Sequence, residues 1–308
     1  MKLIRGLHNL ASFQGACVAT IGNMDGVHLG HQAVLGQLAE KASTLGLPTV
    51  VIVFEPQPQE FFAKENAPPR LSRFREKIEA LRRFSIDYVL CLPFNKRIAS
   101  IRAQDFIQQV LVEGLSVRYL VIGDDFRFGY KREGDFSTLQ AAGEVHDFQV
   151  AKMHSFTIDD VRVSSTAIRQ ALADGDIKAA EKYLGRSFRM SGRVARGDAR
   201  GRELGFPTAN LQLHRAVSPL RGVYAVEMFG LDGEPIPGVA NVGTRPTVDG
   251  TRALLEVHLL DFNRVIYGYH VQVSFLSKIR DEQKFASLEE LVAQIEQDVE
   301  RARELHGV

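Results

Sequence analysis

GNMDGVHLGH, residues 22–31, directly follows the apolar run CVATI at residues 17–21 and leads into a stretch with helical periodicity at 29–45. Glycines in such a turn let backbone N–H groups come close to an anion. The N-terminus of the following helix directs its unpaired N–H groups and the positive end of its dipole to the same point. The stretch therefore predicts a strand, a phosphate-binding turn and a helix, which together begin a βαβ unit.

The same alternation continues along the first part of the chain. Apolar runs predict strands at 49–54, 88–92 and 119–122, and stretches with helical periodicity predict helices at 73–84 and 103–112. Two short helices, one opening at 164–166 and one over 177–184, close this part, and Gly185 marks its end. We expect a Rossmann-like domain with a parallel sheet over residues 1–186.

Residues 187–308 have a different texture. Strands separated by glycine and proline turns are predicted at 188–194, 223–229, 239–242, 254–260 and 271–275. This pattern indicates an antiparallel β-barrel. A terminal helix follows, with Ser287 and Glu290 as a capping box and an apolar stripe that we expect to be buried: Leu288, Leu291, Val292, Ile295 and Val299. A length of 308 residues is enough for these two domains.

Two imidazoles lie in the first turn. His28 and His31 are three residues apart at the helix start, so both can converge on one polyphosphate and donate hydrogen bonds to oxygens that gain charge during attack on an α-phosphate. A single histidine near a helix N-terminus is more often a cap or a solvated residue. Two histidines inside a glycine turn after a strand favour phosphate chemistry over that alternative.

A second group of phosphate-binding residues is predicted far along the chain. In VSSTAIR, residues 163–169, hydroxyl groups open a helix and an arginine follows one turn later, so Ser165, Thr166 and Arg169 are candidates to hold the other phosphates. In isolation this segment is typical of an ordinary capped helix. The segment indicates phosphate binding only in combination with the histidine turn.

Composition excludes several classes of function. Hydrophobic residues make up 45% and charged residues 24% of the chain, as in globular proteins, and the net charge of +1 is not concentrated in either half. We therefore expect no nucleic-acid partner and no membrane partner. Cys17 and Cys91 lack the spacing of a disulfide framework or a zinc site. The absence of an apolar leader or a long apolar run predicts a cytoplasmic protein.

The histidine turn and the 163–169 segment resemble those of the HxGH nucleotidyltransferase superfamily, and residues 22–32 resemble the adenylyltransferase half of bifunctional riboflavin kinase/FAD synthetases. Met24 stands where that family usually has Phe, a departure that leaves the phosphate contacts intact. The loop GDDFRFG at 123–129 is similar to the family's segment beside the flavin and the adenine. The resemblance implies an ATP site of Gly22, Asp25, His28, His31, Ser165, Thr166 and Arg169, and flavin contacts from Phe62, Asp125, Phe126 and Phe128, with Phe54 as further apolar surface.

A second motif, GRVARG at 192–197 continuing through GRELGFPTANL at 201–211, resembles the riboflavin kinase signature. No Walker A pattern is present, so phosphate binding would rely on backbone amides and on Thr208 and Asn210 as oxygen ligands of Mg-ATP. A Thr-x-Asn pair on a strand lies on one face, although an isolated pair is usually structural. Arg196 replaces a His that the family often has. The implied ATP site comprises Gly192, Gly205, Pro207, Thr208 and Asn210.

Two further residues complete the kinase assignment. Glu256 alternates with Leu255 and Val257 on the strand at 254–260, so its side chain is expected on the opposite face from theirs. The resemblance implies that Glu256 is the catalytic base and contacts the flavin; otherwise a solvated glutamate is the simpler interpretation. The segment RDEQKF at 280–285 looks like the family's flavin-side loop, with Arg280 as a flavin contact.

The resemblance covers nearly the whole chain and implies two ATP- and Mg²⁺-dependent reactions: riboflavin to FMN in the C-terminal domain, and FMN to FAD with release of pyrophosphate in the N-terminal domain. Two alternatives stay open. One is an adenylyltransferase for another acceptor, such as nicotinamide mononucleotide or phosphopantetheine, with the barrel as an appendage. The other is a flavin sensor that binds without turnover. The presence of both histidines and of Glu256 argues against this alternative. The sequence leaves the oligomeric state open.

Overall fold

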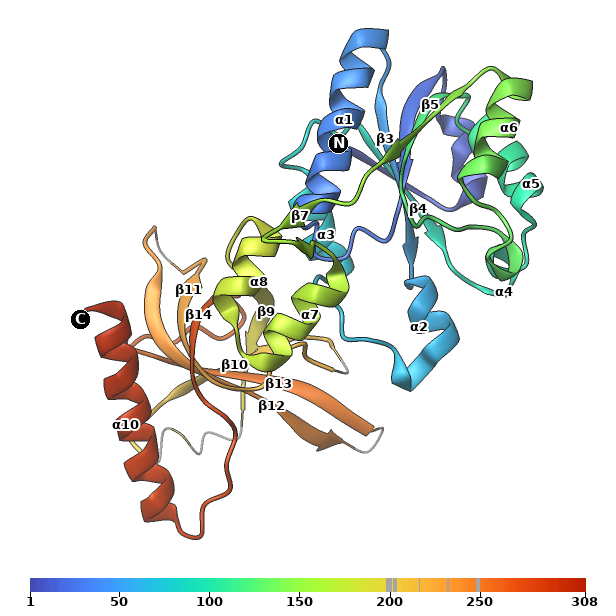
Figure 1. The fold of residues 1–308 in the computed structure, drawn as a ribbon. Coiled ribbons are helices and arrows are strands. Elements are labelled where there is room, and N and C mark those ends of the chain that lie inside the picture. The colour runs from blue at the N-terminus through green and yellow to red at the C-terminus, as the bar shows by residue number, and fades with distance from the viewer. Residues whose placement is uncertain (198–200, 202–203, 216, 232, 248–249) are drawn as a thin grey trace. The chain divides into compact units, whose positions relative to one another are not determined.

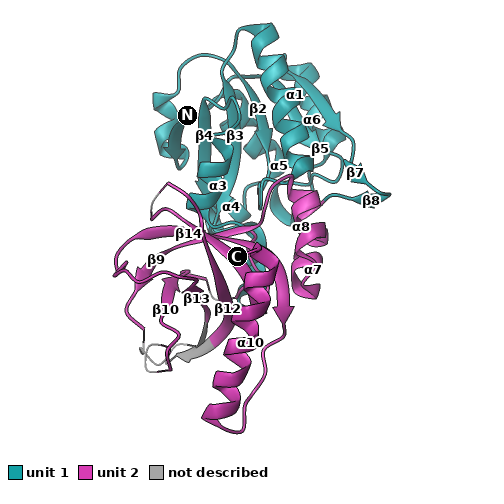
Figure 2. Ribbon diagram, turned by 90° about the vertical axis from the view of Figure 1, so that its left-hand side faces the viewer, with its two compact units in different colours: residues 1–68, 72–163 teal, residues 69–71, 164–308 magenta. Residues whose placement is uncertain are grey.

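The computed structural model describes residues 1–197, 201, 204–215, 217–231, 233–247 and 250–308 (Figure 1). The chain divides into two compact units, which Figure 2 shows in different colours. Unit 1 comprises Met1–Pro68 and Ser72–Val163, and unit 2 comprises Pro69–Leu71 and Ser164–Val308. Packing thus places the helices of residues 165–184 with the second unit, while the expected division of function after residue 186 stays a prediction.

Unit 1 is built on a six-stranded sheet in which every pairing is parallel, in the order β1-β4-β3-β2-β5-β6. Its strands are β1 (Lys2–Arg5), β2 (Cys17–Ile21), β3 (Thr49–Glu55), β4 (Tyr88–Pro93), β5 (Val117–Gly123) and β6 (Gln149–Met153). The chain proceeds from β2 to β3 and β4 on one side, and then places β5 and β6 on the other. The carboxyl end between β2 and β5 is therefore the topological switch point, where such sheets bind ligands.

Helices cover both faces of this sheet because alternate residues of its buried strands point to opposite sides. Val18 and Val51 pack with Leu38 of α1 (Leu29–Leu45) and with α3 (Phe74–Leu81). Ala19 and Ile52 pack on the other face, with α5 (Ala103–Phe106), the π-helix η3 (Ile107–Val112) and α6 (Phe136–His146). The expected parallel α/β architecture is confirmed.

The sequence analysis did not predict several elements of unit 1. The edge strands β1 (KLIR) and β6 (QVAKM) each carry only two consecutive apolar residues and at least one charge, so they lack the signal of a buried strand. The other elements that were not predicted are α6, α2 (Pro58–Ala63), the two-stranded sheet of β7 (Thr157–Ile158) and β8 (Val161–Arg162), α4 (Lys96–Ala99), and the short 3₁₀ helices η1 (Leu7–Ser12), η2 (Lys64–Asn66) and η4 (Tyr130–Arg132).

Unit 2 contains a closed six-stranded antiparallel barrel, ordered β10-β13-β12-β11-β14-β9, which confirms the predicted fold. The strands are β9 (Arg189–Ala195), β10 (Thr208–Gln212), β11 (Gly222–Phe229), β12 (Ile236–Thr247), β13 (Gly250–Leu259) and β14 (His270–Arg280). Helices α7 (Ser165–Asp174) and α8 (Ile177–Leu184) contribute Ile168, Leu172 and Leu184 to the same apolar cluster as Tyr224 and Phe275 of the barrel.

The terminal helix α10 (Leu288–His306) is capped by Ser287, as predicted, because its hydroxyl oxygen accepts the N–H of Glu290 at 3.2 Å. The Glu290 half of the predicted capping box differs, since its carboxylate accepts the N–H of Ala286 at 3.0 Å. The expectation that its apolar stripe is buried was wrong. Leu288 is 56% exposed, and Leu291, Val292, Ile295 and Val299 are only half-buried. The residues of α10 that are buried are Asp298 and Ala302. The most buried positions of this helix are therefore Ala302, a small residue, and Asp298, which forms an ion pair with Arg280 of β14.

Candidate functional site

The turn after β2 adopts a conformation that few sequences tolerate. Met24, Gly26 and Val27 all have positive φ angles, of 49°, 79° and 43°. Met24 and Val27 are 2% and 1% exposed and belong to the apolar cluster between α1 and the sheet. Burial of these two side chains offsets the cost of the left-handed backbone. Met24 therefore fills the packing position behind the turn with a flexible thioether.

His28 is the N-cap of α1. Its Nδ1 accepts the backbone N–H of His31 at 3.4 Å, and the side chain is 6% exposed. The capping role that the sequence left as an alternative is thus present. It also has a chemical consequence, because an Nδ1 that accepts a hydrogen bond carries its proton on Nε2 when the ring is neutral. The cap therefore fixes the tautomer of the neutral His28 ring.

The imidazole of His31 is stacked on that of His28, with ring centroids 3.7 Å apart and an interplanar angle of 21°. Burial lowers the pKa of His31 well below its usual value, and the neighbouring charges of His28 and Lys77 lower it further. Two charged imidazoles in this stack would repel each other. His31 is therefore neutral near pH 7. A neutral imidazole still carries one ring proton, which is enough to donate a hydrogen bond to a phosphate.

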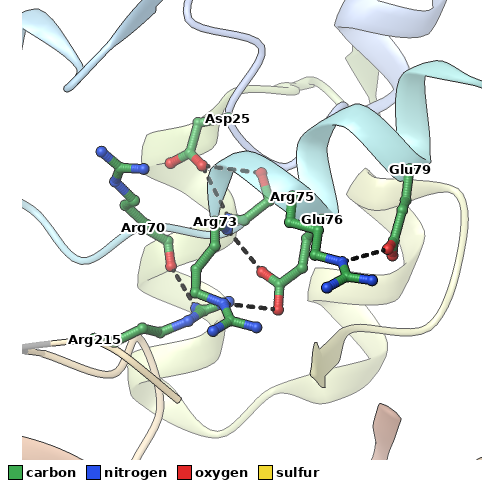
Figure 3. Close-up of polar contacts among 8 residues, drawn as sticks. Asp25, Arg70, Arg73, Arg75, Glu76, Glu79 and Arg215 are labelled. Carbon is green, nitrogen blue, oxygen red and sulfur yellow. Dashed lines mark hydrogen bonds and ion pairs between the residues drawn. The ribbon is translucent and has the colours of Figure 1, made fainter. Parts of the chain in front are cut away.

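Asp25 links the turn to the segment that precedes α3. Its Oδ1 accepts the backbone N–H of Ser72 at 3.0 Å and the Ser72 hydroxyl at 3.3 Å, and the N–H of Gly26 donates to the Ser72 Oγ at 2.9 Å. Ser72 lies two residues before α3, whose first turn is closed by Glu76 accepting the Arg73 N–H at 2.7 Å (Figure 3). The turn of residues 22–28 and the start of α3 are thus tied together.

The last residue of unit 1, Val163, lies against the histidine turn. A Cβ at position 30 would be 3.2 Å from Nδ1 of His28 and 3.4 Å from the carbonyl oxygen of Val163, so Gly30 leaves room for both. Ser165, Thr166 and Arg169 follow in unit 2. The cap of α7 is Ser164, whose Oγ accepts the Ala167 N–H at 3.1 Å, so Ser165 and Thr166 are not the N-cap. Arg169 donates its Nε–H to the carbonyl of Pro69 at 2.7 Å.

The loop after β5 lies at the switch point, since β5 is the neighbour of β2. Asp125 is 73% exposed at its side chain and forms an ion pair of 3.0 Å with Arg162. Arg162 also pairs with Asp124 at 3.0 Å, and the Ser155 hydroxyl that donates to Asp124 holds the pKa of this carboxyl below its usual range. The sequence analysis missed Arg162, which lies 37 positions beyond Asp125.

The predicted flavin aromatics fall into two groups. Phe128 is buried in the core and stacks on half-buried Phe126, with centroids 5.7 Å apart and 13° between planes. Phe62 is 67% exposed and packs edge-on against Phe61 and Phe94, which themselves form a cluster with Phe54. An exposed phenylalanine on such an apolar base offers a flat surface to a ring system.

In the barrel, strand register brings the predicted kinase residues together. Asn210 of β10 is paired with Glu256 of β13, and Glu256 is paired on its other side with Asn241 of β12. Directly paired residues lie on the same face of a sheet with Cβ atoms about 5 Å apart. Leu255 and Val257 are fully buried, so Glu256 lies on the outer face, as predicted. Asn210, Glu256 and Asn241 thus form a row of polar residues across three strands, which we call the polar row. Sequence periodicity could not find Asn241, because only the pairing of strands places it in this row.

Thr208 extends this polar row by two residues along β10, where it is paired with His258. Nδ1 of His258 lies 3.0 Å from the carbonyl oxygen of Pro207. Gly205, just before this segment, has a φ of 87° and so needs a glycine. Gly192 allows β9 to approach β10, because a Cβ there would be 2.9 Å from the carbonyl oxygen of Gln212.

At two glycines of the riboflavin kinase-like motif, the backbone lies close to Asn210 and Thr208. A Cβ at Gly197 would be 2.3 Å from Nδ2 of Asn210, and one at Gly201 would be 2.4 Å from the carbonyl oxygen of Phe206 and 3.3 Å from Oγ1 of Thr208. Backbone without side chains can approach a polyphosphate here. Residues 198–200 and 202–203 of the motif lie outside the described residues. Arg196 is exposed, with its guanidinium 5.8 Å from the ring centroid of Tyr267.

The donor set of the row suits Mg²⁺. A hydroxyl, an amide and a carboxylate supply oxygen ligands, and Mg²⁺ in nucleotide sites usually takes one or two protein ligands together with substrate phosphates. Within the described residues, no group of three or more His, Cys, Asp or Glu side chains is arranged to hold a metal alone. Thr208 and Asn210 fit the role of partial ligands that depend on the nucleotide for the rest of the coordination.

Arg280 is held by the terminal helix. Its Nε and Nη2 donate to the carboxylate of Asp298 at 2.9 and 2.7 Å, and its Nη1 donates to the carbonyl of Asp281 at 2.9 Å. The side chains are 20% and 5% exposed. This bidentate pair joins the end of β14 to α10 and fixes the direction of the guanidinium.

Removal of one partner of this pair should destabilise the barrel. We expect Asp298→Ala to lower the free energy of unfolding by about 3–5 kcal/mol, because a largely buried guanidinium loses its counter-charge. Denaturant unfolding of the full chain measures the loss. The matched control is Arg301→Ala, which breaks an exposed pair with Glu304 on the same helix and should change stability by less than about 1 kcal/mol. Equal effects of the two substitutions would contradict the role of the Arg280–Asp298 pair.

Comparison with known proteins gives a consistent result for both halves of the chain. The family model for FAD synthetase matches residues 10–167, and the model for riboflavin kinase matches residues 184–306. The chain is 55% identical over 309 residues to the bifunctional riboflavin kinase/FMN adenylyltransferase of Escherichia coli strain K12, covering 100% of this chain and 99% of that one. The chain belongs to the bifunctional riboflavin kinase/FMN adenylyltransferase family. The FAD synthetase part precedes the riboflavin kinase part, as the sequence predicted.

Other relatives of this member of the riboflavin kinase/FMN adenylyltransferase family also match it over nearly its whole length. The protein of that name from Haemophilus influenzae is 52% identical over 303 residues, which cover 98% of each chain. A crystal structure described as that of a macrolide-efflux protein from Streptococcus pneumoniae has a TM-score of 0.83 and 32% identity over 98% of each chain. None of the helices in the described part of our chain has the length and apolar character needed to cross a bilayer.

Proposed function

We propose that this chain converts riboflavin to FMN with one ATP in its barrel and converts FMN to FAD with a second ATP in its N-terminal part. The observation that carries the proposal is the presence in one chain of two separate sets of residues. One is the row Thr208, Asn210 and Glu256 on the outer face of the barrel. The other is the stacked pair of His28 and His31 at the switch point of the parallel sheet. Membership of the family over the whole length supports both.

In the kinase step, the ribityl 5′-oxygen of riboflavin attacks the γ-phosphorus of ATP, and ADP leaves. Glu256 accepts the hydroxyl proton and orients the attacking oxygen. Its position supports this role, because strand register places it beside Asn210, one of the residues assigned to the nucleotide, on the outer face of the barrel. Arg280, oriented by Asp298, is assigned to the flavin, and Gly192, Gly205 and Pro207 shape the nucleotide segment around Thr208 and Asn210.

Mg²⁺, which we assign to Thr208, Asn210 and the phosphates, would neutralise charge that develops on the transferred group. The chain's own residues do the rest of the work. Gly197 and Gly201 let backbone lie close to Asn210 and Thr208, so that backbone N–H groups can contribute to phosphate binding beside these side chains. Removal of the divalent ion by a chelator should therefore stop FMN formation.

In the adenylyl-transfer step, a phosphate oxygen of FMN attacks the α-phosphorus of ATP. The bond from this phosphorus to the α,β-bridging oxygen breaks, and that oxygen leaves as part of pyrophosphate. No covalent intermediate with the protein forms. His28, through Nε2–H, and His31 donate to the phosphate oxygens that gain charge. We assign Ser165, Thr166 and Arg169 to the same nucleotide, with Gly22 and Asp25 supporting the turn. Exposed Phe62 and the loop of Asp125, Phe126 and Phe128 are assigned to the flavin.

A product assay tests the proposal directly. Purified protein incubated with riboflavin, ATP and Mg²⁺ should form FMN first and then FAD, which chromatography separates by retention time. Supplied FMN and ATP should give FAD and pyrophosphate without riboflavin. Failure to convert riboflavin, combined with adenylylation of another phosphate-bearing acceptor, would favour the alternative of a different adenylyltransferase. Tight flavin binding without product would favour a sensor.

A cytoplasmic location completes the proposal. Both cysteines are free thiols and are buried, at 0% and 6% exposure. This supports a reducing compartment, because the fold needs no disulfide for its cores.

A further inference from the structure

The loop of residues 281–287, which joins β14 to α10, carries a carboxylate that the proposed mechanism does not use (Figure 1). This carboxylate belongs to Glu282 and lies against the backbone of β12. A Cβ built at Gly243 would be 3.2 Å from the carboxyl carbon of Glu282 and closer still to its Oε1. The exposed Glu282 thus covers a buried glycine, and only a glycine leaves room for the carboxylate there.

Strand register places Gly243 beside the polar row. Val242 is fully buried, so its neighbours Asn241 and Gly243 in β12 point to the outer face of the barrel. Asn241 is directly paired with Glu256, and Gly243 is therefore the diagonal neighbour of Glu256. Such diagonal neighbours lie about 7–8 Å apart, within reach of long side chains. The carboxylate of Glu282 is thus on the same face of the barrel as the proposed base and close to it.

The pairing of the strands also accounts for how a loop that starts at β14 reaches β12. Arg280, the last residue of β14, is paired with Val223 of β11. Val223 is paired on its other side with Asn241, which is in turn paired with Glu256. These four residues follow one another across four neighbouring strands. The loop begins at one end of this line, and Glu282 extends toward the end that carries the proposed base.

Contacts on both sides of Glu282 hold the loop without using Glu282 itself. The carboxylate of Asp281 forms an ion pair of 2.6 Å with Lys278 of β14. The amide nitrogen of Gln283 donates to Oε1 of Gln294 on α10 at 3.1 Å. Within the residues that the structure describes, the carboxylate of Glu282 forms no hydrogen bond and no ion pair. Its neighbours therefore keep it beside the polar row, with its acceptor capacity available to a ligand.

The chemistry of an ionised carboxylate narrows the choice of that ligand group, because it accepts hydrogen bonds and donates none. The proposed kinase step places the ribityl 5′-oxygen of riboflavin at Glu256. The hydrogen-bond donors of riboflavin that follow from this end of the molecule are the other ribityl hydroxyls, whereas the ring N–H lies at the opposite end. A carboxylate one diagonal step from Glu256 is suited to these hydroxyls.

We propose that Glu282 is a specificity-determining residue of the kinase site: its carboxylate accepts a hydrogen bond from a ribityl hydroxyl other than the 5′-hydroxyl, and so aligns the chain with Glu256. The inference rests on the proposed conversion of riboflavin to FMN in the barrel. It assigns to the loop of residues 281–287 a contact with the ribityl chain of the flavin, in addition to the flavin contact assigned to Arg280.

The first test compares the two substrates of the kinase step. Glu282→Ala should raise KM for riboflavin about 10-fold and leave KM for ATP within about 2-fold, because a hydrogen bond to a charged acceptor is lost on the flavin side only. Glu282→Gln keeps an acceptor oxygen, so its KM for riboflavin should be intermediate. Glu296→Ala, which removes an exposed carboxylate from α10, is the control and should change neither value. An equal rise in KM for ATP would assign the carboxylate to the nucleotide or its metal ion and overturn the proposal.

The second test identifies the hydroxyl and separates a contact from a structural role. The 2′-, 3′- and 4′-deoxy analogues of riboflavin each lack one ribityl hydroxyl and keep the reacting 5′-hydroxyl. With the unmodified protein, kcat/KM should fall about 10-fold for one of the three. Glu282→Ala should not distinguish this analogue from riboflavin, because the two partners of one hydrogen bond are coupled. A loosened loop would leave the discrimination in place, and this result would overturn the proposal.

A binding measurement separates failure of the inference from failure of the proposed function. If the unmodified protein forms no FMN, the proposed kinase function is wrong, and calorimetry with riboflavin in the presence of ADP and Mg²⁺ decides the inference. Riboflavin should bind about 10-fold more weakly to Glu282→Ala than to the unmodified protein, and equal affinities would overturn the proposal. If Glu282→Ala does not fold, Glu282→Gln replaces it in each comparison, with a smaller loss of affinity and of discrimination.

Discussion

Replacement of Glu256 by glutamine should lower the rate of FMN formation by about 10²–10⁴-fold, the range that general-base catalysis contributes. The amide keeps the shape and the hydrogen-bonding capacity of the side chain but cannot accept the proton of the ribityl hydroxyl. Because Glu256 lies on the outer face of β13, the substitution leaves the barrel core of Leu255 and Val257 intact. Chromatographic measurement of FMN from riboflavin and ATP gives the rate.

The same variant provides its own control. FAD formation from supplied FMN should be unchanged, because that step uses residues of a different part of the chain. Glu227→Gln on β11 is the matched substitution, since Glu227 is paired with Pro237 and Ser274 rather than with any residue of the polar row. A loss of both activities in a folded Glu256→Gln protein would show that the two sites are not separable.

His31→Gln should have the opposite effect. Loss of a hydrogen-bond donor to the developing phosphate charge is expected to lower FAD formation by about 10²–10³-fold and to leave FMN formation unchanged. His31 is the sharper test because His28 also caps α1, so truncation of His28 would combine a catalytic and a structural loss. FAD and pyrophosphate released from supplied FMN and ATP are the quantities to measure.

Two control variants make the result specific. His28→Asn keeps a good N-cap while it removes the Nε2 donor, so a similar loss there would assign catalysis to both rings. His146→Gln, in the last turn of α6, should change neither activity. If His31→Gln retains full FAD formation, His31 has no part in the chemistry, and the His28→Asn variant alone decides the role of the other ring.

Much of the fold was accessible from local patterns. The strand at 17–21, the helix at 29–45 and the helix at 177–184 have the predicted bounds, because a buried apolar run or a capped amphipathic stretch defines each of them. The edge strands β1 and β6 were not found, since edge strands carry charges and short apolar runs. The half-burial of α10 was not predictable either, because periodicity shows which face of a helix is apolar but not how much of it meets a partner.

The sites show the same limit. The histidines, Thr208, Asn210 and Glu256 lie within motifs whose residues are close in sequence. Arg162 pairs with Asp125 and Asn241 is the strand neighbour of Glu256, and both pairings join distant segments that no local pattern connects. Lys77 is a different case. Its position in the helix at 74–81 is consistent with a solvated residue, and only the packing of α3 against the sheet shows that its charge is buried.

The closed barrel has a consequence for how substrates arrive. Its interior contains buried side chains such as Tyr224 and Phe275, as expected of a small barrel whose centre is packed with side chains. Under the proposed function, Thr208, Asn210 and Glu256 act on the exterior of β10 and β13, so riboflavin and nucleotide would dock from bulk water onto the wall. FMN can then depart without any strand separating, so product exit need not involve partial unfolding of this part of the protein.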